Sequence, residues 1–130
     1  MNATLKSFFK KYNNANLDDA GAYVSPEYAK YQSDLKRTMT KFAESIGAKV
    51  NSFTKSHYFE SIVFERDGKF AYLHHEGMDR TLIKLDVHYG FSFSDWFART
   101  MAHAKDWKGG CNVNNVTFEN LEDTINGLLR

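Results

Sequence analysis

The feature that most constrains the fold is a two-residue turn inside an apolar run. Asp67 and Gly68 interrupt the stretch FESIVFERDGKFAYLHHE, which is rich in β-branched and aromatic residues on both sides. An Asp-Gly pair in this setting is typical of a β-hairpin, because both turn positions need positive φ. The chain is therefore expected to contain antiparallel strands. The turn predicts a register that pairs Glu65 with Phe70, Val63 with Tyr72, Ser61 with His74, Phe64 with Ala71, Ile62 with Leu73 and Glu60 with His75.

Helical patterns lie on both sides of this hairpin. Residues 3–12 carry apolar side chains at helical spacing, and Ser25-Pro26-Glu27 is a helix start whose helix Gly47 would end. A last amphipathic helix is expected over residues 118–129, with Thr117 as its N-cap. The expected buried stripe of the longest helix consists of Tyr28, Tyr31, Leu35, Met39, Phe42 and Ile46.

The residues between the hairpin and the last helix give mixed patterns. Residues 81–89 alternate between apolar and polar side chains, which predicts a further strand. Two interpretations stay open for residues 94–104: a helix capped by Ser94-Asp95, or a strand continuing the aromatic alternation that begins at Tyr89. Residues 106–115 are expected to form a turn. The whole order predicts an α+β fold in one domain, 1–130, with an antiparallel sheet of about 3–5 strands packed against N-terminal and C-terminal helices.

Composition limits the setting and the classes of function. One Cys in 130 residues cannot form an internal disulfide, which favours a reducing compartment such as the cytoplasm. No apolar run reaches the ~18 residues of a membrane helix. The net charge of +1 combines nine Lys/Arg and five Asp/Glu in residues 1–56 with an acidic remainder. This balance excludes a strongly acidic imitation of DNA, and neither part alone establishes a nucleic-acid surface.

Four of the five His residues lie between residues 57 and 88, close to carboxylates. Imidazole and carboxylate together suit Zn, Mn or Fe, so a metal-dependent hydrolase or nuclease is one alternative. The favoured interpretation is a set of polar strand ends at a wet sheet edge, without metal or cofactor, because neighbouring His residues on a strand point to opposite faces. If a metal were bound, its ligands would be His74, His75, Asp79, Asp86 and His88.

The segment KDWKGGCN, residues 105–112, is a second place where chemistry could be expected. Cys111 has no partner at a spacing that supports a thiolate pair. Gly109 and Gly110 lack the Lys-Ser/Thr and the helix that follow a phosphate-binding loop. A structural corner is expected instead, in which the two glycines make the bend and Trp107 packs against the domain.

The longer segment RTMAHAKDWKGGCN resembles a pattern in small proteins of bacterial phages and mobile elements. Those chains read R-T-A, a short polar stretch and then D-[YW]-T-G-G-x-N, after a strand that ends in Asp-Arg, as HEGMDR does here. Lys108 and Cys111 depart from the usual Thr and Ser, and Met101 separates Thr100 from Ala102. The matching residues are Arg99, Thr100, Asp106, Trp107, Gly109, Gly110 and Asn112.

This resemblance implies an accessory protein, and several phage proteins of this size are anti-CRISPR or other anti-defence inhibitors. An inhibitor needs a rigid fold and a surface with aromatic and charged anchors, not catalytic residues. The expected function is therefore inhibition of a bacterial defence protein complex, such as a CRISPR nuclease, by a monomer or homodimer that binds no membrane. A nucleic-acid-binding accessory protein is a further alternative. The candidate binding residues are Lys30, Arg37, Lys41, Arg80, Arg99, Asp106 and Trp107.

Overall fold

The computed structural model describes residues 2–12, 26–55, 59–76, 96–103, 106–107, 113–116 and 120–130. Helices and strands in these ranges follow the order expected from the sequence, with helices at both ends of the described chain. The elements are α1 (Ala3–Tyr12), α2 (Pro26–Ser45), β1 (Lys49–Lys55), β2 (Phe59–Arg66), β3 (Lys69–Glu76), β4 (Trp96–His103), β5 (Asp106–Trp107), β6 (Val113–Val116) and α4 (Leu121–Leu128).

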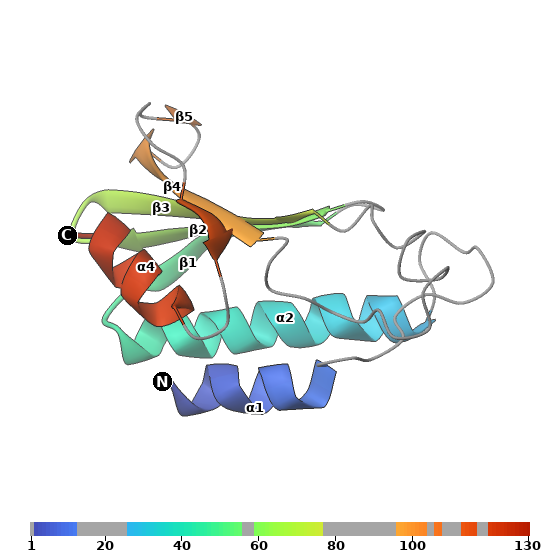
Figure 1. Cartoon of the computed structure of the whole chain (residues 1–130). Helices are drawn as coiled ribbons and strands as arrows, with labels where there is room; N and C mark the ends of the chain where they lie inside the picture. Colours follow the sequence, from blue (N-terminus) through green and yellow to red (C-terminus); the bar gives the residue numbers. More distant parts are fainter. Residues whose placement is uncertain are drawn as a thin grey trace.

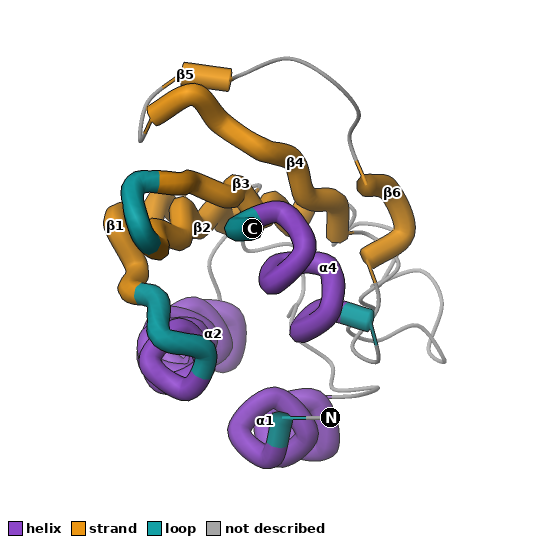
Figure 2. The backbone as a smooth tube through the Cα atoms, turned by 90° about the vertical axis from the view of Figure 1, so that its left-hand side faces the viewer, coloured by secondary structure: helices purple, strands orange, loops and turns teal. Residues whose placement is uncertain are grey.

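The strands form one antiparallel sheet that carries helices on one of its faces. β1, β2, β3 and β4 are neighbours in chain order, and the short strands β5 and β6 both pair with β4. Figure 1 shows α2 and α4 against the same face of the sheet, with α1 on the side of α2 that is turned away from it. Figure 2 shows the same three layers from one end. The predicted α+β class is confirmed.

The Asp67-Gly68 hairpin forms with the register that the sequence predicts. All six predicted pairs occur between β2 and β3, from Glu65 opposite Phe70 to Glu60 opposite His75. Asp67 has φ 52° and Gly68 has φ 78°, as a tight turn that follows the twist of the strands requires. This hairpin is the centre of the sheet, because β1 adds to one side of it and β4 to the other.

Gly47 ends α2 in a left-handed backbone conformation, which glycine adopts with little strain. Its φ is 72°. The Gly47 N–H donates to Glu44 O at 3.1 Å, and the Ala48 N–H donates to Ala43 O at 2.8 Å. These two bonds are those of a Schellman motif, and they satisfy carbonyl groups that the helix end leaves over.

The core lies between the sheet and the helices. Phe42 of α2 meets Phe64 of β2 edge to face, with ring centroids 5.8 Å apart, and α1 adds the ring of Phe8 at 5.8 Å from Tyr31. The predicted stripe of α2 is buried at four positions, Ile46 is partly buried, and the side chain of Tyr28 lies outside the described set. The fully buried apolar residues include Leu5, Tyr31, Leu35, Met39, Phe42, Ile62, Phe64, Leu73, Leu121 and Ile125.

Arg66, the last residue of β2, binds residues near the ends of α2 and α4. Its guanidinium Nη1 donates to Ile46 O at 3.0 Å, just past the end of α2, and to Asn126 Oδ1 at 2.7 Å. Nη2 donates to Asn126 O in the last turn of α4 at 3.3 Å. A cation among the terminal carbonyl groups of two helices is favourable, because each helix carries partial negative charge at that end.

Of the two interpretations left open for residues 94–104, the strand is confirmed: residues 96–103 form β4, because their backbone completes the open edge of β3. Two other expectations about the last third of the chain are wrong. Residues 113–115, expected as the end of a turn, form strand β6 on β4 together with Val116. The last helix begins at Leu121 with Asn120 as its N-cap, so it is shorter than the helix expected from residue 118. The predicted strand over 81–89 lies outside the described residues.

Candidate binding site on the two N-terminal helices

Helices α1 and α2 form an antiparallel pair that is tied together at one end by Asn2. The Asn2 Oδ1 atom caps α1 by accepting the N–H groups of Thr4 at 2.9 Å and Leu5 at 3.3 Å. The Asn2 Nδ2 group donates to Ser45 Oγ at the end of α2, at 2.7 Å. The start of α1 therefore lies beside the end of α2, and Lys11 near the end of α1 lies beside the first half of α2.

A buried carboxylate between these helices holds two cations. Asp34 of α2 is 6% exposed. Its Oδ2 accepts the ammonium group of Lys11 at 2.7 Å, and its Oδ1 accepts the guanidinium group of Arg37, one turn further along α2. The side chains of Lys11 and Arg37 are 52% and 62% exposed, so both cationic heads are at the surface above the carboxylate.

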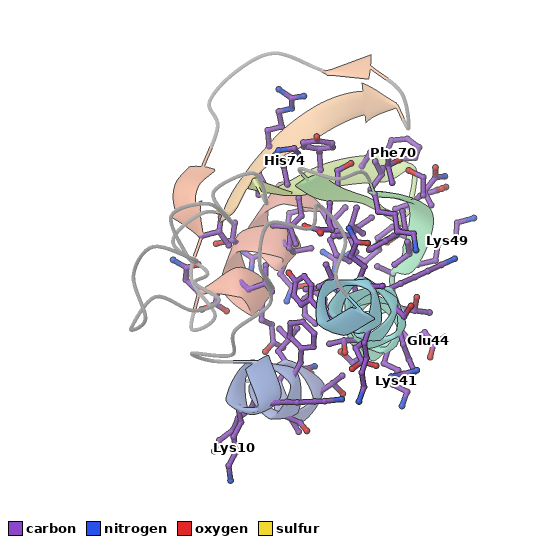
Figure 3. The ribbon with its side chains drawn as sticks, turned by 90° about the vertical axis from the view of Figure 1, so that its right-hand side faces the viewer. Lys10, Lys41, Glu44, Lys49, Phe70 and His74 are labelled. Carbon is purple, nitrogen blue, oxygen red and sulfur yellow. The ribbon has the colours of Figure 1, made fainter. Side chains whose placement is uncertain are left out.

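These residues line a groove of about 400 Å³ between the two helices. The groove combines three cations with one carboxylate, three hydroxyl groups and two apolar side chains. Its lining consists of Ala3, Thr4, Ser7, Phe8 and Lys11 from α1, and of Asp34, Arg37, Thr38 and Lys41 from α2. Cationic and hydroxyl donors around an apolar surface suit an anionic group that carries an aliphatic or aromatic part. Figure 3 shows Lys41 on the side of α2 nearer α1, whereas Lys10 points away from α2.

Three binding residues predicted from the sequence lie on a single stripe of α2. Lys30, Arg37 and Lys41, together with Asp34, follow one another at helical spacings of three or four residues. Lys30 is exposed, and Arg37 and Lys41 line the groove. Asp34 is not among the binding residues predicted from the sequence. Its spacing from Arg37 is readable in the sequence, whereas its pairing with Lys11 depends on how α1 packs.

Arg99 lies in a second cluster, on the face of the sheet opposite the helices. Its guanidinium carbon is 4.7 Å from the centre of the Tyr72 ring, and the two residues are cross-strand partners. The Tyr72 hydroxyl is 2.9 Å from His74 Nδ1, and the two rings are nearly parallel. The cluster consists of a stacked cation, a phenol and an imidazole from the neighbouring strands β3 and β4.

A buried polar pair links α2 to the sheet. Gln32 Nε2 donates to Glu60 Oε1 at 2.9 Å, and Glu60 has no exposed surface. A carboxylate in this position needs hydrogen bonds, because burial without them is costly. The hydrogen bond between them connects the first half of α2 to the start of β2.

The suspected metal ligands are not gathered into a site in the described part of the chain. His74 is 9% exposed and has Tyr72 as its neighbour, whereas His75 stands in register with Glu60 of β2. No group of three His, Cys, Asp or Glu side chains in the described ranges is arranged to hold a metal ion. Asp79, Asp86 and His88 lie outside these ranges.

The segment from Arg99 to Asn112 is described only in part. Asp106 and Trp107 form β5, a two-residue strand on β4, so the expected corner begins with a strand pairing and not a free turn. Residues 108–112 and Arg80 lie outside the described residues. No helix in the described ranges is long and apolar enough to cross a membrane. No protein family, curated protein or solved structure matches the chain.

Proposed function

We propose that this chain is an inhibitor that binds a bacterial defence protein complex, such as a CRISPR nuclease, through its α1–α2 face. One observation carries the proposal: the cations Arg37 and Lys41, expected from the sequence to bind, line one groove together with Lys11 of the neighbouring helix. Binding sites of inhibitors are built from a rigid support and charged or aromatic anchors. The resemblance of residues 99–112 to phage accessory proteins supports the choice of a defence complex as partner.

The charge pattern supports contact with an acidic protein surface. The groove is lined by the three cations Lys11, Arg37 and Lys41 and by one acidic residue, although the whole chain has a net charge of only +1. Positive charge gathered on one face steers an acidic partner to that face and sets its orientation. An inhibitor of this kind performs no chemistry, and one copy of the chain blocks one copy of the complex.

The proposal is tested in bacteria that each carry one active defence system. Efficiency of phage plating is measured with the wild-type chain, with Lys11→Glu/Lys41→Glu and with the control Lys10→Glu/Lys36→Glu. The control changes the net charge equally, and Lys10 and Lys36 are exposed residues of the same helices outside the groove. We expect the wild type and the control to restore plating against one system and the groove variant to fail. Failure of the wild type against every system in the panel would reject the function.

Nucleic-acid binding is the second candidate, and the row of lysines on α1 is the observation that favours it. Neutralising phosphates releases counterions, so such binding weakens steeply as salt rises. Titration of a labelled single-stranded and a labelled double-stranded oligonucleotide at two salt concentrations separates the candidates. Affinity that falls steeply with salt, and that Lys10→Glu/Lys36→Glu reduces as much as the groove variant does, favours this second function.

A further inference from the structure

We propose that the α1–α2 groove is a subsite for carboxylate side chains of an acidic peptide segment in the partner. This inference rests on the proposed function, because it names the chemistry that the same face recognises. Its basis is the contact that the groove already makes with a carboxylate. Asp34 binds two of the cations in the groove: Lys11 through Oδ2 and Arg37 through Oδ1.

The groove lining has a net positive charge that can attract a further anion. Lys11, Arg37 and Lys41 face a single acidic residue, Asp34, so the lining is positive overall. Lys41 lies one turn beyond Arg37 on the same stripe of α2. Within the described part of the chain Lys41 makes no hydrogen bond or ion pair. An anion at the Lys41 end of the groove is thus attracted without displacing an internal partner.

The remaining lining residues favour a carboxylate on an aliphatic stem. Ala3 and the small exposed part of the Phe8 ring offer apolar contact, and the hydroxyl groups of Thr4, Ser7 and Thr38 offer further donors. A glutamate side chain has this composition: methylene groups that pack on an apolar surface and a single negative charge at the tip. A row of phosphates fits less well. Its higher density of negative charge is repelled more strongly by the carboxylate of Asp34 in the groove lining.

The occupant is therefore an acidic stretch of polypeptide, and at least two of its carboxylates bind along the groove. One lies at Lys41, and the next lies over the exposed heads of Lys11 and Arg37. The groove volume of about 400 Å³ accommodates side chains of the partner and leaves its backbone at the surface. Specificity then comes from the spacing between the Lys41 end and the Asp34 end.

The test uses the purified chain and a fluorescent octaglutamate peptide, with binding followed by anisotropy at low and moderate salt. Lys41→Glu is compared with Lys36→Glu, and Lys11→Glu with Lys10→Glu. Each pair makes the same charge change on the same helix, inside and outside the groove. We expect the groove variants to weaken binding about tenfold, and the controls by less than about threefold.

Equal weakening within both pairs would overturn the inference, because it would mean that only overall charge attracts the peptide. Tighter binding of an octathymidylate than of octaglutamate would overturn it as well, and would point to nucleic acid. Absence of peptide binding to the wild-type chain at low salt rejects the carboxylate subsite. Thermal melting of each variant shows that it folds, and if Lys11→Glu melts at lower temperature the α2 pair decides alone. The plating experiment uses no peptide, so the function and the subsite fail independently.

Discussion

Replacing Arg66 by Met tests the account of how the helices are held in place. The substitution keeps an unbranched apolar stem and removes a guanidinium group that donates to Ile46 O, Asn126 Oδ1 and Asn126 O. A hydrogen bond from a charged donor contributes about 1.5–3 kcal/mol. The contact at 3.3 Å is weak, and water replaces part of the others, so the two short bonds set the estimate. We expect a loss of about 3 kcal/mol in the free energy of unfolding, or roughly 10 °C in melting temperature.

Arg37→Met is the matched control for this measurement. It removes the same group from a side chain that is 62% exposed and whose partner is Asp34. The guanidinium group of Arg37 is at the surface, and Lys11 still pairs with Asp34 after the substitution, so this variant should lose about 1 kcal/mol, less than Arg66→Met. Urea unfolding gives both values from the shift of the midpoint, provided the slope stays unchanged. Equal losses of stability in the two variants would show that Arg66 does not join α2 and α4.

Three further substitutions examine local features. Gly47→Ala should cost about 1–2 kcal/mol, because Gly47 has φ 72° and a β-carbon there meets nothing within 4 Å, so the cost is one of backbone conformation. A β-carbon at Gly127, in the last turn of α4, also meets nothing within 4 Å, so Gly127→Ala should stabilise the fold by about 0.5 kcal/mol. A loss of stability in both glycine variants would contradict this comparison. Gln32→Leu removes the donor to the buried Glu60 carboxylate and should cost about 1–3 kcal/mol in urea unfolding, whereas a neutral effect would show that the pair does not hold α2 on the sheet.

Local signals account for the parts of the fold that the sequence predicts well. The register of the β2–β3 hairpin follows from Asp67-Gly68, since a two-residue turn leaves only one pairing. The end of α2 follows from Gly47, because glycine adopts positive φ without the strain that a β-carbon causes. Both features are decided by residues within a few positions of each other, so they can be read without knowledge of the tertiary structure.

Features that depend on distant contacts could not be predicted in the same way. Residues 96–103 carry both helix and strand patterns, and the open edge of β3 decides between them. The candidate site is similar: Lys30, Arg37 and Lys41 can be chosen from one helix, but the groove exists only when α1 packs on α2. Lys11 is 23 positions from Asp34, and no local pattern indicates that they meet.

The central proposal is that the chain acts by binding a partner through the α1–α2 groove and not by catalysis. The most direct measurement titrates the purified wild-type chain into the defence complex that the plating experiment identifies, with nuclease activity as the readout. Inhibition is predicted to reach its end point at a fixed molar ratio that does not change with incubation time, and Lys11→Glu/Lys41→Glu is predicted to shift that titration far to the right. Inhibition by catalytic amounts of the chain, deepening with time, or an unchanged titration with the groove variant, would contradict the account.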